Sequence, residues 1–136
     1  MRRLLLCLLA SGLPIACSSA PPDNGNKAVQ SERWATPVKH DANLYRIDDK
    51  LYRSEQPVVE DGEAIVKLGI QSVINLRFFD RNDDDHLKAY GLTLLNRPLL
   101  SWSIKPKEIA EILYLIEKQQ QNGAVLIHCY HGADRT

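Results

Sequence analysis

The residues with the clearest capacity for chemistry lie at the carboxyl end of the chain. Cys129 and Arg135 are separated by five residues, with Gly132 midway between them and His128 directly before the Cys. A Cys thiolate can attack phosphorus, and an Arg guanidinium can hold two phosphate oxygens and offset transition-state charge. Gly132 allows a tight turn in which successive N–H groups face one anion. The spacing predicts a phosphate-binding loop that carries a nucleophile.

The elements around this loop can be predicted from the hydrophobic pattern. The run at 124–127 is short, apolar and rich in β-branched residues, which predicts a buried strand that delivers the loop. Residues 43–47 and 50–54 are expected to form a hairpin or two adjacent edge strands. The other expected elements are a helix at 57–68, strands at 72–77 and 92–96, and a helix from Pro106 whose apolar stripe is Ile109, Ile112, Leu113 and Ile116. This alternation predicts an α/β fold, a central sheet flanked by helices, with the loop at a carboxyl edge.

Residues 128–136 resemble the signature of the cysteine-dependent phosphatases, His-Cys-x5-Arg-Ser/Thr. The form ending Asp-Arg-Thr is typical of bacterial dual-specificity and tyrosine phosphatase-like proteins. The stretches Leu-Tyr-Arg-Ser-Glu-Gln-Pro at 51–57 and Val-Ile-Asn-Leu-Arg at 73–77 resemble the amino-terminal half of the same family. The resemblance extends over 44–136. A merely buried structural Cys would leave the accompanying Gly, Arg and Thr unexplained.

This resemblance implies hydrolysis of phosphomonoesters in two steps through a phosphocysteine. Cys129 attacks phosphorus, Arg135 and the loop amides hold the oxygens, and water releases phosphate. Thr136 is expected to hydrogen-bond the Cys129 sulfur. His128 is expected to fix the loop and favour the thiolate, with a His satisfied inside the core as the alternative. The substrate-binding positions of the loop are Tyr130, His131, Gly132 and Ala133.

The general acid is harder to assign. Members of the family usually carry an Asp on a separate loop before the Cys, but the corresponding stretch at 96–106 has no carboxylate. Asp134, inside the signature, is therefore the first candidate. The alternative is that Asp134 only stabilises the loop as an acceptor. Glu108 and the acidic run at 80–85 are the remaining candidates.

The substrate class depends on what the loop lacks. Phosphoinositide phosphatases of this superfamily tend to have Lys at the positions of Tyr130 and Ala133, where additional phosphates need positive charge. We therefore expect a phosphorylated protein or a small aryl phosphoester, with a phosphoinositide as the alternative. A non-catalytic phosphate-ester binding module is a further alternative, although the nucleophile Cys129 favours an enzyme. A purely structural lipoprotein would not need Gly132 and Arg135.

Neither a cofactor nor nucleic acid is expected. Asp83, Asp85 and His86 could each donate to a metal, but their spacing is not that of an EF-hand. The run is predicted to be a solvated helix start without a metal. The 136 residues contain 17 basic and 17 acidic side chains, so no basic field for polyanions exists.

The first residues predict export. Residues 1–16 have a basic start, an apolar run too short to span a bilayer permanently and a small-residue end, as in a signal peptide. The pair Ala16-Cys17 resembles the bacterial lipoprotein box, which implies lipidation of Cys17 and a membrane anchor facing the periplasm or cell exterior. Ordinary secretion is the alternative. Residues 17–33 have the composition of a flexible tether.

The remaining residues, 34–136, are expected to form one phosphatase-like domain. After loss of Cys7 and lipidation of Cys17, Cys129 would be the only thiol, which excludes an internal disulfide. The chain stops at Thr136, whereas in the family that it resembles the loop leads into a helix whose amino end points at the phosphate. The domain is therefore expected to be partial, with the carboxy-terminal helices missing.

Overall fold

The computed structural model describes residues 35–79 and 83–136. The predicted signal peptide and tether lie outside the described residues. Within the part of the chain that is described, no helix has the length and apolar character needed to cross a bilayer.

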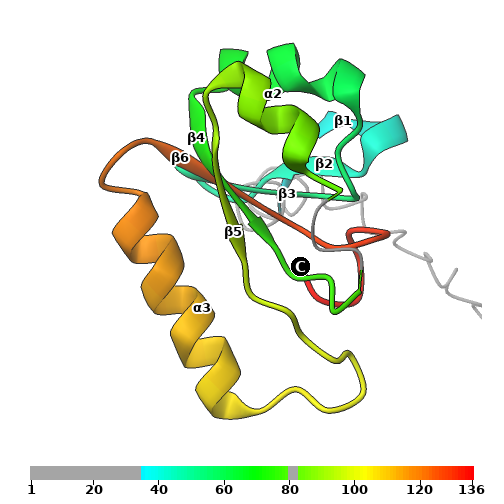
Figure 1. Cartoon of the computed structure of the whole chain (residues 1–136), viewed down its shortest axis with the longest axis vertical. Coiled ribbons are helices and arrows are strands. Elements are labelled where there is room, and N and C mark those ends of the chain that lie inside the picture. The colour runs from blue at the N-terminus through cyan, green and yellow to red at the C-terminus, as the bar shows by residue number, and fades with distance from the viewer. Residues whose placement is uncertain (1–34, 80–82) are drawn as a thin grey trace, which may run out of the picture.

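A six-stranded sheet with the strand order β1-β2-β3-β6-β4-β5 forms the centre of the fold (Figure 1). The strands are β1 Thr36–Lys39, β2 Leu44–Arg46, β3 Leu51–Ser54, β4 Ile70–Asn75, β5 Thr93–Asn96 and β6 Ala124–His128. The first three strands pair antiparallel, whereas β6 is parallel to both of its neighbours, β3 and β4. All five residues of β6 are buried, as predicted for the strand before the signature.

Helical segments cover both faces of the sheet. The short helices η1 His40–Ala42, η2 Val59–Asp61, α2 Gly62–Lys67 and η3 Asp85–Tyr90 lie toward one face, and α3 Pro106–Gln119 lies on the other (Figure 1). Alternate side chains of β6 enter the two cores: Ala124 and Leu126 pack with Ile65 of α2, whereas Val125 and Ile127 pack with Ile116 of α3. The predicted α/β architecture, a sheet flanked by helices, is confirmed.

Two predicted helices differ in detail from the structure. Val58 is extended, with φ −103° and ψ 171°, so the helix predicted from residue 57 begins only at Val59, as a 3-10 turn. In α3 the predicted stripe is partly wrong, because Ile109 and Leu113 are 40% and 60% exposed while Leu115 is buried. The helix is rotated so that the row through Ile112, Leu115 and Ile116 faces the sheet, and apolar residues on both rows made the sequence pattern ambiguous.

The edge strand β1 was not predicted. Its residues, Thr36–Lys39, are mostly exposed and show no apolar alternation. β1 pairs with β2, and the predicted hairpin of β2 and β3 is confirmed. The strand predicted at 72–77 forms two residues earlier, at Ile70–Asn75. This shift places residues 76 and 77 beyond the strand end, beside the signature loop.

Candidate active site

The signature loop leaves the carboxyl edge of the sheet between two parallel neighbours. His128, the last residue of β6, is level with Ser54 at the end of β3 and with Asn75 at the end of β4. The carbonyl of His128 accepts a hydrogen bond of 2.9 Å from the N–H of Leu76. Residues that directly follow β3 and β4 therefore flank the loop on its two sides.

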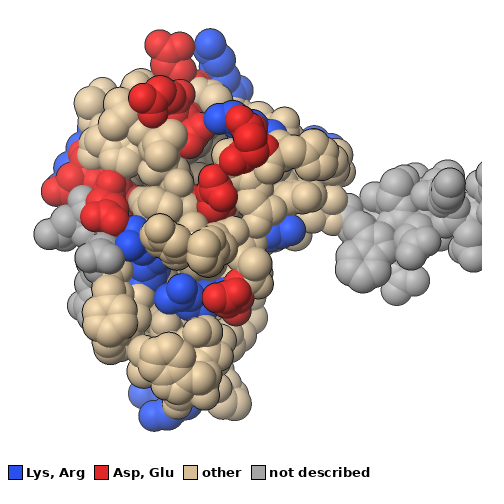
Figure 2. All heavy atoms as spheres, turned by 90° about the vertical axis from the view of Figure 1, so that its right-hand side faces the viewer, with Lys and Arg blue, Asp and Glu red and all other residues tan. Residues whose placement is uncertain are grey.

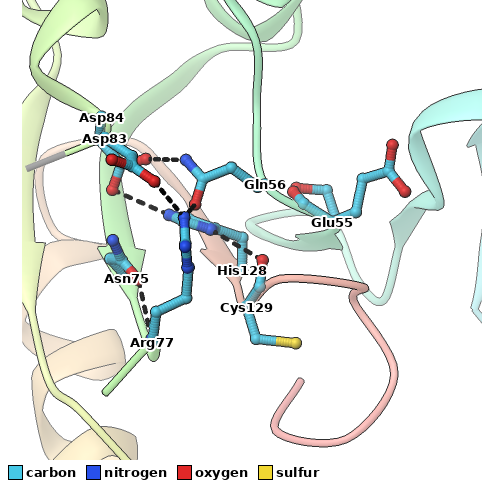
Figure 3. Close-up of polar contacts among 9 residues, drawn as sticks. Glu55, Gln56, Asn75, Arg77, Asp83, Asp84, His128 and Cys129 are labelled. Carbon is cyan, nitrogen blue, oxygen red and sulfur yellow. Dashed lines mark hydrogen bonds and ion pairs between the residues drawn. The ribbon is translucent and has the colours of Figure 1, made fainter. Parts of the chain in front are cut away.

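Cys129 lies inside the turn of the loop with its sulfur facing the loop backbone (Figure 3). Its side chain is fully buried, and the N–H of Gly132 donates to Sγ at 3.2 Å. Burial raises the pKa of the thiol, but the backbone N–H groups of Arg135, Ala133, Gly132 and Asp134 lower it by more. The pKa of Cys129 therefore lies below its ordinary value, because the N–H groups stabilise the thiolate.

The backbone conformation and the close packing at position 132 require a glycine. Its φ is +67°, in the left-handed region, and a Cβ at this position would lie 2.5 Å from the backbone carbonyl carbon of Ser54. The loop thus turns directly against the end of β3, which leaves no room for a side chain. The predicted tight turn is confirmed.

One side-chain polar atom of Arg135 and one of Thr136 have no hydrogen-bond partner among the described residues. These two atoms, Nε of Arg135 and Oγ1 of Thr136, are buried. The expected hydrogen bond from Thr136 to the Cys129 sulfur does not form here, and its role in turnover stays a prediction. A buried guanidinium N–H without a partner fits a group that binds phosphate oxygens.

The rim of the loop is exposed. Tyr130 is 55% exposed, and its ring meets that of His131 edge to face, with 4.6 Å between the centroids. His131, Ala133 and Asp134 are also exposed. Figure 2 views the molecule from the right-hand side of Figure 1. On this face a small group of basic side chains lies between acidic and uncharged regions. This face therefore carries both signs of charge.

His128 is part of a buried polar network (Figure 3). Its Nε2 lies 3.0 Å from Oδ2 of Asp84, and its Nδ1 lies 3.3 Å from the carbonyl oxygen of Cys129. Both ring nitrogens therefore face oxygen atoms. Asp84, 3% exposed, also accepts a hydrogen bond of 2.6 Å from Gln56 Nε2. Burial raises the pKa of Asp84, but the hydrogen bond and charge of His128, with the hydrogen bond from Gln56, hold it below its ordinary value.

Arg77 extends this network to the loop. Its guanidinium, almost fully buried, donates to Oε1 of Gln56 at 2.8 Å and pairs with Asp83. The guanidinium carbon lies 5.1 Å from the centroid of the Tyr130 ring. The residues after β3 and β4 are thereby connected to a residue of the signature.

The acidic run was predicted to be a solvated helix start, and for Asp84 this prediction is wrong. The 3-10 helix η3 begins at Asp85, and the turn before it directs Asp84 onto His128. Asp85 is solvated and pairs with Lys88 at 2.8 Å. Residues 80–82 lie outside the described residues. Among the described residues, no group of three or more His, Cys, Asp and Glu could hold a metal.

A second set of contacts holds the loop from the side of β2 and β3. The side-chain amide of Asn43 donates to the carbonyls of His131 and Gly132 at 2.8 and 3.1 Å. Arg53 Nη1 also donates to the carbonyl of Gly132, at 2.5 Å. Sequence reasoning missed Asn43 and Arg53, as it missed Gln56, Arg77 and Asp84. The matching stretches at 51–57 and 73–77 contained three of these five residues, which was the available signal.

The candidates for the general acid differ in their exposure and in their hydrogen bonds. Asp134 is exposed within the loop, and its backbone N–H is directed at the Cys129 sulfur. Glu108 is engaged at the start of α3, where Oε2 accepts the Lys105 N–H at 2.7 Å. Glu55, half-buried directly after β3, is a further carboxylate near the loop that the sequence did not suggest (Figure 3).

Comparison with known proteins gives a consistent set of relatives. No protein-family profile matches the chain. The chain is 29% identical over 109 residues to the dual specificity protein phosphatase TpbA of Pseudomonas aeruginosa, covering 80% of this chain and 49% of that protein. The chain thus spans about half the length of the curated relatives that it matches.

Solved structures agree with this similarity. The crystal structure of P. aeruginosa TpbA superimposes with a TM-score of 0.72 at 29% identity, covering 79% of this chain and 65% of that chain. A Cys-to-Ser variant of TpbA in complex with phosphotyrosine gives a TM-score of 0.69 at 27% identity, covering 76% and 62% of the two chains. Together with the signature loop, these similarities support placing the chain in the cysteine-dependent phosphatase superfamily.

Proposed function

We propose that the protein hydrolyses phosphomonoesters of the phosphotyrosine or dual-specificity type through a phosphocysteine. The observation that carries this proposal is the convergence of loop N–H groups on the buried Sγ of Cys129, which favours the thiolate. The same N–H groups are placed to bind the equatorial oxygens of a phosphoryl group that approaches the sulfur.

The reaction has two steps. The Cys129 thiolate attacks phosphorus, a P–S bond forms, and the ester oxygen leaves with a proton from a general acid. Water then gives a proton to the same acid group as it attacks phosphorus, the P–S bond breaks, and inorganic phosphate and the thiolate are released. Arg135 binds two phosphoryl oxygens and offsets their charge in both transition states. Asp134, exposed and adjacent to Arg135, is the proposed acid.

A phosphotyrosine substrate is supported by two observations. The loop has Tyr130 and Ala133 where a polyphosphorylated ligand would need basic side chains. The related TpbA variant was crystallised with phosphotyrosine. We therefore propose a phosphotyrosyl side chain as the substrate.

The proposal is tested by quenching the reaction with a phosphotyrosine peptide under acid and isolating a phosphorylated Cys129. We expect a burst of the dephosphorylated product in the natural chain and none in Cys129→Ser. Asp134→Asn is expected to slow hydrolysis of a poor leaving group by about 10²-fold or more and that of a nitrophenyl ester far less. Binding of the peptide without any burst would instead indicate a non-catalytic module. An unchanged rate in Asp134→Asn would move the acid elsewhere, with Glu55→Gln as the next variant.

We further propose that the protein is exported and anchored to a membrane by lipid on Cys17. The support is the residue pattern at 1–16 and the Ala16-Cys17 pair. Metabolic labelling with a fatty acid is expected to mark the natural chain, and Cys17→Ser is expected to abolish the label. Labelling of Cys17→Ser at the natural level would contradict lipidation at this residue.

A further inference from the structure

Three consecutive carbonyl groups of the signature loop each accept a hydrogen bond from an assigned donor. The donors are the Gln56 N–H to the oxygen of Tyr130, Asn43 Nδ2 to that of His131, and both Asn43 Nδ2 and Arg53 Nη1 to that of Gly132. Gln56 donates to Tyr130 at 3.1 Å through its backbone, so this contact does not depend on a side chain. The carbonyls of His131 and Gly132, in contrast, depend on two side chains.

The direction of a carbonyl fixes the direction of the next N–H, because the peptide unit is planar and trans. The N–H that follows the His131 carbonyl belongs to Gly132 and lies 3.2 Å from Sγ of Cys129. The N–H that follows the Gly132 carbonyl belongs to Ala133. Both of these N–H groups lower the pKa of Cys129. The carbonyls that accept from Asn43 and Arg53 therefore belong to the same two peptide units as the two N–H groups that face the sulfur. Each carbonyl and its N–H lie on opposite sides of one peptide plane.

Both donors are held independently of the loop. Asn43 has φ 45° and ψ 35°, a left-handed conformation that Asn tolerates better than most residues, and its backbone N–H donates to the His40 carbonyl at 3.1 Å. Arg53 is half-buried in β3, and its guanidinium carbon lies 4.4 Å from the centroid of the Tyr45 ring. These contacts lie within the segment that contains the first three strands and do not involve the loop.

We propose that Asn43 and Arg53 are positioning residues for the reaction at Cys129. By holding the carbonyls of His131 and Gly132 outward, they direct the N–H groups of Gly132 and Ala133 toward the sulfur and an incoming phosphoryl group. The proposal rests on the proposed function for its meaning in catalysis. The geometry itself is testable without turnover, because the thiolate and its N–H donors can be observed directly.

The test compares variants of the full chain that remove one donor each. Asn43→Gly removes the amide and keeps the left-handed conformation accessible, and Arg53→Gln removes the guanidinium. Arg46→Gln is the matched control, because Arg46 is exposed on the same hairpin and is not among the donors to the loop. The readouts are ultraviolet titration of the thiolate, referenced to Cys129→Ser, and calorimetric binding of inorganic phosphate.

We expect the thiolate-to-thiol ratio at a fixed pH to fall about tenfold in Asn43→Gly and in Arg53→Gln, with a similar weakening of phosphate binding. Arg46→Gln is expected to titrate like the natural chain. Arg53→Lys, which can still donate, is expected to recover part of the loss. A residue that merely ties the loop to the sheet would change the unfolding midpoint without moving the thiolate titration. Natural titration in folded Asn43→Gly and Arg53→Gln would overturn the proposal.

The natural chain provides a second measurement that does not require the variants to fold. Deprotonation of Cys129 is expected to shift the amide proton signals of Gly132 and Ala133 downfield, and unmoved signals would also overturn the proposal. If Asn43→Gly and Arg53→Gln shift the thiolate titration but the natural chain turns over no phosphate ester, the proposed function fails while the positioning by Asn43 and Arg53 stands.

Discussion

The signature loop is held in different ways on its two sides. On the inner side, toward β4 and η3, Gln56, Arg77, Asp84 and His128 form a buried network, which we call the inner network. On the outer side, Asn43 and Arg53 donate to backbone carbonyls at partly exposed positions, which we call the outer contacts. The inner network combines buried charges, whereas the outer contacts use neutral carbonyls as acceptors.

Because of this difference, we expect the inner network to affect mainly the stability of the domain and the outer contacts mainly the direction of the loop N–H groups. A buried charge that loses its partner is costly, so a break in the inner network lowers the free energy of unfolding of the domain. A carbonyl near the surface that loses its donor can turn to water at little cost, but its peptide unit is then free to rotate. We therefore expect changes in the inner network to alter stability first, and changes in the outer contacts to alter the thiolate first.

The largest effect is expected for Asp84→Ala. This variant leaves His128 buried without its carboxylate partner and Gln56 without an acceptor, so it should lower the free energy of unfolding by about 3 kcal/mol. Urea unfolding measures the loss. Asp85→Ala is the control, since its exposed pair with Lys88 should contribute less than about 1 kcal/mol. Equal losses in the two variants would show that the buried pair has no special weight.

Gly132→Ala is expected to have the next largest effect, because it acts where the outer contacts and β3 meet. Gly91→Ala is a matched control: Gly91 also has a positive φ, of +76°, but a Cβ there meets nothing within 4 Å. Gly91→Ala should cost about 1 kcal/mol from backbone strain alone. Gly132→Ala should cost at least about 2 kcal/mol, because strain and overlap with the backbone of Ser54 add. A cost equal to that of Gly91→Ala would mean that the loop can move away from β3.

The position of the site could be predicted from the sequence, whereas the contacts that hold the signature loop in place could not. The buried strand before Cys129 and the turn at Gly132 are local patterns, and both appear where they were predicted. The outer contacts join residues 79 to 89 positions apart, so strand order rather than local periodicity creates them. Asp84 was missed because it lies in a run of identical Asp residues, and the sequence does not show which of them is buried.

A smaller effect is expected in acid, and only from the inner network. The folded-state pKa of Asp84 is lowered, so its stabilising contribution is complete above the unfolded-state pKa and is lost as pH falls through the folded-state value. The loss should therefore occur below about pH 4. Asp84→Asn should start less stable near neutral pH and lose less stability on acidification. An identical slope of the free energy of unfolding below that pH in both chains would contradict this assignment.

The smallest effects are expected from the two Tyr rings that contact Arg side chains, and they distinguish the two sides most sharply. Tyr45 lies 4.4 Å from the guanidinium carbon of Arg53, and Tyr130 lies 5.1 Å from that of Arg77. Replacing either ring by Leu should cost about 1 kcal/mol or less. Tyr45→Leu loosens an outer contact and should also raise the pKa of Cys129, because Arg53 then holds the Gly132 carbonyl less firmly.

Tyr130→Leu, in contrast, should leave the thiolate titration unchanged, since Arg77 remains fixed by Gln56 and Asp83 and the Tyr130 carbonyl keeps the Gln56 N–H. Parallel titrations of Tyr45→Leu and Tyr130→Leu measure this contrast at nearly equal cost in stability. If Tyr130→Leu shifts the titration as much as Tyr45→Leu, the inner network also sets the direction of the loop N–H groups, and the division between the two sides is wrong.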